Sequence, residues 1–176
     1  MADKTYQILN QFELIPYLDE LRQRDTEQIF VFGISEEGRI LYCQYAGIDS
    51  KINSCACNFR EIIKMALNND VSGIIICHNH PNSNLLFPSK EDINLTRDLY
   101  YLCNELQIEL FDHLIVSKTK AYSFDDKGVL SSLASTKSTD KIYAGIIKKH
   151  FAPLNKLIPN LQRLTTELQK FIQGEK

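Results

Sequence analysis

The chain has 176 residues, of which 44% are hydrophobic and 24% are charged, so its composition is that of an ordinary globular protein with one domain and a modest extension. Its formal net charge of −2 gives no overall reason to expect a nucleic-acid-binding protein, and no apolar run approaches the roughly 20 residues of a membrane span. The N-terminal residues lack the apolar core of a signal peptide, so we expect a soluble cytoplasmic protein that has no membrane partner.

The first third of the chain predicts a helix followed by a pair of strands. Apolar residues recur at helical spacing between about residues 12 and 24, which indicates one amphipathic helix. The segments 29–32 and 40–45 are rich in apolar and aromatic residues, with the turn sequence Glu36-Glu37-Gly38 between them. A connection this short joins neighbouring antiparallel strands, so we expect a hairpin.

The middle of the chain alternates between helix and strand. Asn58 precedes a helical apolar pattern and is the expected N-cap of a second helix. Residues 71–78 are short, apolar and β-branched, as in a strand that is buried on both faces. Pro88 and Ser89 begin a third helix, and residues 108–124 supply two further strands. This order predicts an α/β sandwich with a mixed sheet.

Residues after Asp125 differ in character from those before it. Residues 126–139 are small and polar and predict a linker or a loosely held lid, and a helix follows from residue 140. We therefore divide the chain into an N-terminal helix (1–25), a central domain (26–125), the linker or lid (126–139) and a basic helical extension (140–176).

The C-terminal extension carries an apolar seam and an excess of positive charge. The seam, at alternating spacings of three and four, consists of Leu154, Leu157, Leu161, Leu164, Leu168 and Phe171. It indicates a helix that either docks on the central domain or forms a homodimer or binds a partner helix. From Lys137 onward there are eight basic and three acidic side chains, a net charge of +5 that leaves −7 for the rest. This asymmetry permits nucleic acid as a partner of the basic tail.

The five cysteines indicate a reducing compartment. Their number is odd and the sequence contains no Cys-x-x-Cys pair, so we expect buried thiols rather than a disulfide framework. Cys77 lies next to His78 in the predicted buried strand. Because side chains alternate along a strand, Cys77 should face the core on the side opposite His78.

Two histidines end this buried strand. Residues two apart on a strand point to the same side, so His78 and His80 aim together while Asn79 points away. Two imidazoles supply half of a zinc site. Asp92, in the first turn of the next helix, could supply a third ligand and leave a fourth position open for water, as in catalytic zinc sites.

The same residues also have purely structural explanations. A histidine at a strand end is commonly a satisfied core or surface residue, and Ser89 with Asp92 matches a capping box at a helix start. The combination of these features favours the metal site. An apolar strand that ends in His-x-His-Pro and is followed by Pro-Ser-x-x-Asp at the start of a helix rarely arises by chance.

The segments HNHP and PSKEDINLT, followed by DHLIV, resemble the RadC branch of the JAB/MPN (JAMM) metalloprotease superfamily. The resemblance covers about residues 26–124 and implies a mixed-sheet α-β-α sandwich of the JAB/MPN, cytidine-deaminase-like type, here with a C-terminal helical extension. The helix-hairpin-helix region that usually precedes this domain is expected to be absent, since only residues 1–25 precede the first strand.

The resemblance departs from the family pattern in the loop after the histidines. Eight residues separate His80 from Ser89, one more than is usual, and Asn82-Ser83 replaces the usual Ser-Gly. The extra residue lies in a loop and leaves Pro-Ser-x-x-Asp intact, so we expect Asp92 to keep its place.

By this resemblance, His78, His80 and Asp92 bind a zinc ion as cofactor. Ser89 would hydrogen-bond the zinc-bound water or the developing oxyanion. A carboxylate must also act as general base and deliver a proton to the leaving amine. Glu27, just before the first strand, lies where the superfamily places this glutamate.

Three residues near the motif keep alternative roles. Glu61, in the second predicted helix, is the alternative general base to Glu27. Asp112 and His113 either support the zinc ligands from behind or anchor the start of a strand.

The resemblance implies a zinc-dependent hydrolase that cleaves a peptide or isopeptide amide bond. The alternative is a DNA-repair or DNA-associated accessory protein without protease activity, with or without a bound metal, in which the basic tail could contact DNA. A non-catalytic scaffold is disfavoured because every metal position of the motif is present.

Overall fold

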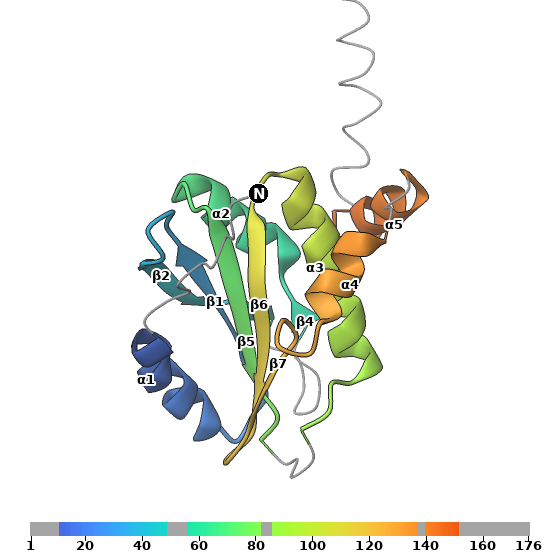
Figure 1. Ribbon diagram of the computed structural model, residues 1–176. Helices are drawn as coiled ribbons and strands as arrows, with labels where there is room; N and C mark the ends of the chain where they lie inside the picture. The colour runs from blue at the N-terminus through green and yellow to red at the C-terminus, as the bar shows by residue number, and fades with distance from the viewer. Residues whose placement is uncertain (1–10, 49–55, 82–85, 137–139, 152–176) are drawn as a thin grey trace, which may run out of the picture. The chain divides into compact units, whose positions relative to one another are not determined.

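The computed structural model describes four stretches of the chain, residues 11–48, 56–81, 86–136 and 140–151. They belong to two compact units, residues 1–137 and 138–176. In chain order the elements are α1 (Gln11–Arg22), β1 (Ile29–Ile34), β2 (Ile40–Tyr45), β3 (Gly47–Ile48), β4 (Ala56–Cys57), α2 (Phe59–Asn68), β5 (Gly73–Asn79), α3 (Lys90–Glu105), β6 (Glu109–Val116), β7 (Ala121–Ser123), α4 (Val129–Ser135) and α5 (Asp140–His150) (Figure 1).

The first unit is built on a five-stranded mixed sheet in the order β2-β1-β5-β6-β7. β1 pairs antiparallel with β2 and with β5, β5 pairs parallel with β6, and β7 closes the far edge antiparallel to β6. The predicted α/β architecture with a mixed sheet is therefore confirmed. β5 lies at the centre and is buried along its whole length, as its unbroken apolar sequence predicts.

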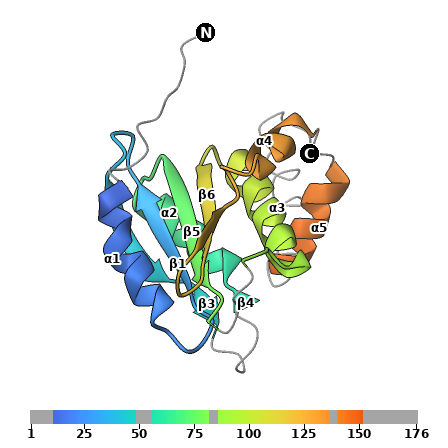
Figure 2. The same cartoon turned by 60° about the horizontal axis from the view of Figure 1, so that its bottom comes forward.

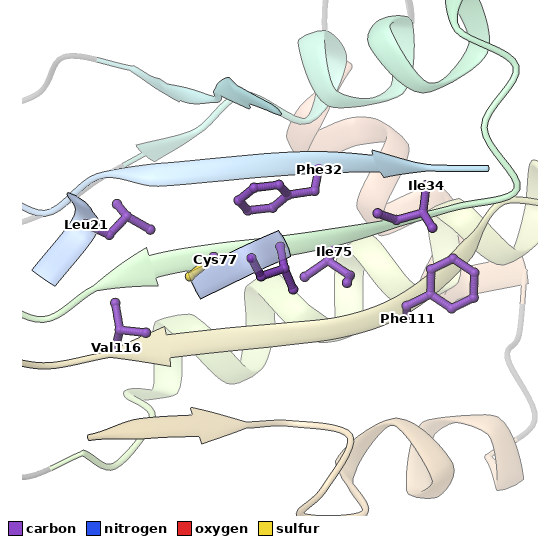
Figure 3. Close-up of a cluster of buried hydrophobic side chains, with 8 residues drawn as sticks. Leu21, Phe32, Ile34, Ile75, Cys77, Phe111 and Val116 are labelled. Carbon is purple, nitrogen blue, oxygen red and sulfur yellow. The ribbon is translucent and has the colours of Figure 1, made fainter. Parts of the chain in front are cut away.

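Helices cover both faces of this sheet, α1 on one side and α2 with α3 on the other (Figures 1 and 2). The α1 side holds a cluster made of Leu14, Leu21, Phe32, Ile34, Ile75, Cys77, Phe111 and Val116 (Figure 3). Cys77 is fully buried in this cluster, so it faces away from His78 as expected. The cysteines of the described residues, at positions 43, 57, 77 and 103, are free thiols.

A β-bulge in β6 decides which of its side chains face α3. Ile74 of β5 pairs with Leu110, but the next residue, Ile75, pairs with Asp112, so Phe111 is the extra residue. Because side chains alternate along a strand, this single insertion reverses the faces of all later residues. His113 consequently pairs with Ile76 and lies on the same face of the sheet as His78.

Two features of the first unit differ from the sequence predictions. The segment 126–139, predicted as a linker or lid, contains helix α4, whose Leu130 is buried. Its serine-rich composition concealed the apolar spacing of Val129, Leu130 and Leu133, and tertiary contact with α3 stabilises the helix. The short sheet formed by β3 and β4 was also not predicted.

The second unit contains α5, which matches the helix expected from residue 140 onward. The apolar seam from Leu154 to Phe171, and with it most of the basic tail and the predicted homodimer contact, lies outside the described residues. None of the helices that the structure describes has the length and apolar character required to cross a bilayer.

Candidate metal centre

The carboxyl end of β5 presents two imidazole rings on one side. The His78 ring is buried and the His80 ring is partly buried, and their Nε2 atoms lie 3.0 Å apart. The His80 N–H donates to the carbonyl of Val116 at 2.8 Å, which extends the pairing with β6 one residue past β5. The two rings therefore stand on a fixed piece of backbone, and they lie on the same side of it, as the His-x-His spacing predicted.

The start of α3 brings a carboxylate to the same point. Ser89 is the N-cap, and its Oγ accepts a hydrogen bond from the Asp92 N–H at 3.0 Å. In return the Ser89 N–H and hydroxyl each donate to Asp92 Oδ2 at 2.7 Å, which completes the predicted capping box. These contacts fix the Asp92 carboxylate, whose Oδ1 lies 3.1 Å from His78 Nε2 and whose Oδ2 lies 3.5 Å from His80 Nε2.

A fourth group, Glu27, reaches this point from the segment before β1. Ile29 of β1 pairs with His78, and Glu27, two residues earlier, approaches the same side. One ligand-capable atom from each of Glu27, His78, His80 and Asp92 lies within 4.8 Å of the other three. Glu61 is not part of this cluster, because it is half exposed on α2 and forms an ion pair with Lys64 at 3.6 Å.

Glu27, Asp92 and His80 have shifted pKa values in this cluster. Burial raises the pKa of Glu27, although the nearby His78 and His80 oppose this shift. Burial also acts to raise the pKa of Asp92, but the hydrogen bonds with the two histidines outweigh it and hold that pKa well below its usual range. The hydrogen bond to Asp92 raises the pKa of His80 despite the opposing effect of burial.

This donor set fits a divalent cation. Two imidazole nitrogens and carboxylate oxygens are the ligands that zinc takes in catalytic sites. The buried Asp92 carboxylate is paired within this set, because its Oδ1 and Oδ2 atoms lie 3.1 and 3.5 Å from the Nε2 atoms of His78 and His80. The structure thus brings together residues that could bind a metal ion.

Behind the cluster lies a buried contact that the sequence left open. His113 Nε2 lies 2.8 Å from His78 Nδ1, and His113 Nδ1 lies 2.6 Å from the Thr96 hydroxyl. The His113 ring stacks on Phe124 with its centroid 4.5 Å away. Burial, reinforced by the neighbouring His78, lowers the pKa of His113 well below its usual value. Thr96 gave no signal in the sequence beyond its place one helical turn after Asp92.

Asp112 faces away from the cluster. Its carboxylate accepts hydrogen bonds from the Ser123 hydroxyl at 2.6 Å and from the N–H groups of His113 and Asp125 at 2.7 and 3.0 Å. Burial raises its pKa to about 6, although these hydrogen bonds oppose the shift. Asp112 therefore organises the turn after β7, while its neighbour His113 supports the histidine cluster.

A family model for the RadC-like JAB domain matches residues 8–129 of the chain. Among curated proteins, a UPF0758 protein from Chlorobium chlorochromatii is 34% identical over 104 residues, which are 59% of this chain and 46% of that protein. A UPF0758 protein from Clostridium botulinum is 31% identical over 134 residues, 72% of this chain and 58% of that protein. The chain spans about half the length of the curated relatives it matches.

Proposed function

Because the chain belongs to the RadC-like JAB domain family, we propose that it is a zinc-dependent hydrolase that cleaves a peptide or isopeptide amide bond with water. The observation that supports this proposal is the convergence of Glu27, His78, His80 and Asp92 within 4.8 Å. The His-x-His pair and the Asp92 carboxylate would hold the ion. A zinc ion bound there would supply Lewis-acid activation of water and of the amide carbonyl.

Glu27 is the proposed general base. Its carboxylate lies among the metal-binding groups, whereas Glu61 points to solvent beside Lys64. Burial raises the pKa of Glu27, which increases its affinity for the proton that the attacking water gives up. Glu27 would then pass this proton to the leaving amine nitrogen, whose protonation allows the C–N bond to break.

Ser89 is the proposed oxyanion donor. Its single hydroxyl proton is directed at Asp92 Oδ2, which also receives the Ser89 N–H. If the hydroxyl turned toward the substrate oxygen, Asp92 Oδ2 would keep the backbone hydrogen bond. Ser89 could therefore stabilise the oxyanion without releasing Asp92.

The proposal is tested on the full 176-residue chain, purified without added metal. We expect close to one zinc ion per chain by elemental analysis, and hydrolysis of members of a panel of fluorogenic peptides and isopeptide-linked substrates. The Glu27→Gln variant should retain its zinc and lose at least about 100-fold in kcat. The matched control, Glu61→Gln, should keep wild-type kcat.

Two results would overturn this assignment. A chain that takes up no zinc, even when zinc is added, cannot be this hydrolase, and a DNA-associated role for the domain would then be favoured. Full activity of Glu27→Gln together with loss of activity in Glu61→Gln would transfer the general-base role to Glu61.

A further inference from the structure

A line of hydrogen bonds runs from the start of α3 through the interior to His78. The Thr96 hydroxyl lies 2.7 Å from the carbonyl oxygen of Asp92 and 2.6 Å from His113 Nδ1. The other ring nitrogen of His113, Nε2, lies 2.8 Å from His78 Nδ1. We call these three side chains the Thr96–His113–His78 relay. It ends at His78 Nε2, which faces Asp92 and His80.

The relay is closed to solvent. The three side chains belong to residues that are each 0% exposed. The His113 ring stacks nearly parallel on Phe124, at 9° between their planes, which restrains its rotation. The nitrogen and oxygen atoms that link these side chains therefore keep the same partners.

The relay has two self-consistent proton arrangements if both rings are neutral, because a neutral imidazole has one donor and one acceptor nitrogen. In the first, the Thr96 hydroxyl donates to the Asp92 carbonyl, His113 Nδ1–H donates to Thr96 Oγ1, and His78 Nδ1–H donates to His113 Nε2. In the second, every hydrogen bond between side chains is reversed, and His78 carries its proton on Nε2. The two arrangements hold the same number of protons.

The arrangements differ in what they offer to the metal centre. The first leaves a lone pair on His78 Nε2, which points at the cluster. The second places a proton on Nε2, where it blocks coordination and is instead donated to Asp92 Oδ1, 3.1 Å away. Without a metal ion, the 3.1 Å contact between His78 Nε2 and the Asp92 carboxylate suits the second arrangement. The carbonyl of Asp92 can only accept, so its 2.7 Å contact with the Thr96 hydroxyl suits the first arrangement, which is the one that a metal ion bound to His78 Nε2 requires.

We propose that His113 and Thr96 are positioning residues that fix His78 in the tautomer protonated on Nδ1, and so reserve its Nε2 for the metal ion. Hydrogen bonds to the distal nitrogen of a ligating histidine orient the ring and make it a stronger ligand. Helix α3 carries both Asp92 and Thr96, so the same turn of helix supplies a ligand and the end of the relay. This inference rests on the metal site of the proposed function.

Zinc affinity of the full chain provides the first test, measured by competition with a chromogenic chelator. His113→Leu, which removes the acceptor for His78 Nδ1–H, should weaken zinc binding about 10–100-fold. Thr96→Val, which keeps the shape but lacks the hydroxyl, should weaken it by a smaller factor. The matched control Thr96→Ser keeps the hydroxyl and should bind zinc as the wild type does.

The second measurement needs no variant. Long-range ¹H–¹⁵N correlation spectra of the zinc-loaded wild type should show His78 protonated on Nδ1 and bound through Nε2. Thermal unfolding of the zinc-free variants checks that they fold. If His113→Leu does not fold, the inference is tested by the zinc affinity of the near-isosteric variant Thr96→Val and by the spectrum of the wild type.

Each outcome separates this inference from the proposed function. Wild-type zinc affinity in folded His113→Leu and Thr96→Val would overturn the relay and leave the metal site intact. A spectrum with the His78 proton on Nε2 would do the same. A wild type that binds no zinc would overturn the proposed function, and this inference with it.

Discussion

Asn79 Oδ1 accepts a hydrogen bond from the N–H of Gln28 at 2.7 Å, across the sheet from the two histidines that flank it in sequence. Its amide nitrogen donates to the carbonyls of Arg24 and Thr26 at 3.2 and 3.0 Å. One buried side chain thus binds three backbone groups of the segment that carries Glu27. The residue between the two histidines holds the proposed general base in place.

Asn79→Ala should therefore affect both stability and catalysis. Loss of three partly buried hydrogen bonds to the backbone should lower the free energy of unfolding by about 2–3 kcal/mol. Because the segment before β1 would loosen, we expect kcat to fall at least about 10-fold while zinc content stays near that of the wild type. Denaturant unfolding, elemental analysis and steady-state kinetics measure the three quantities.

Asn69→Ala is the matched control for this prediction. Asn69 donates its side-chain amide to the Met65 carbonyl at the end of α2, away from the cluster. The variant should lose about 1 kcal/mol or less and keep wild-type kcat. If Asn79→Ala is destabilised but turns over substrate normally, Asn79 stabilises the fold without orienting Glu27.

Ser89 and Asp92 share one capping box but should differ in their effect on the metal. Replacing Ser89 by Ala removes an N-cap and the proposed oxyanion donor, so we expect a loss of about 1 kcal/mol in stability and about 100-fold in kcat with zinc retained. Replacing Asp92 by Ala removes a proposed metal ligand, so the zinc content of this variant should fall sharply. Elemental analysis of both variants measures this difference.

Ser89→Thr is the control that separates these effects, because threonine keeps a hydroxyl that can cap the helix. It should retain zinc and most of the stability. Unchanged zinc content in Asp92→Ala would show that the ligand assignment is wrong, whatever happens to activity.

Asp112 should make stability depend on pH below neutrality. Burial raises the pKa of its carboxyl group to about 6, above the value of about 4 in an unfolded chain. Between these pH values the folded state binds more protons than the unfolded state. Stability from this residue is thus fully present below about pH 4 and is lost as the pH rises through about 6, on the order of 2 kcal/mol in total.

Asp112→Asn removes this titration and retains acceptors for the N–H groups of His113 and Asp125. The difference in unfolding free energy between wild type and variant should therefore change between pH 4 and 6 and level off above about pH 7. Urea unfolding at a series of pH values measures it. A difference that is constant from pH 4 to 7 would contradict the raised pKa.

The amino-acid sequence determined the architecture and three residues of the candidate metal centre, His78, His80 and Asp92. A short run of apolar, β-branched residues such as 73–77 removes its side chains from water only as a strand that is covered on both faces. The period of two then obliges His78 and His80 to share a side, and the capping chemistry of Ser89 and Asp92 fixes where α3 begins. These are local rules, so they can be read from neighbouring residues alone.

Only the tertiary structure decided which distant groups meet the histidines. The bulge at Phe111 turns His113 rather than Asp112 toward His78. No pattern in the sequence predicts the position of this β-bulge. The pairing of β1 with β5 brings Glu27, rather than Glu61, to the cluster. Sequence spacing specifies the direction of a side chain along its own element, but strand register, which is set by packing of the whole sheet, specifies its partners.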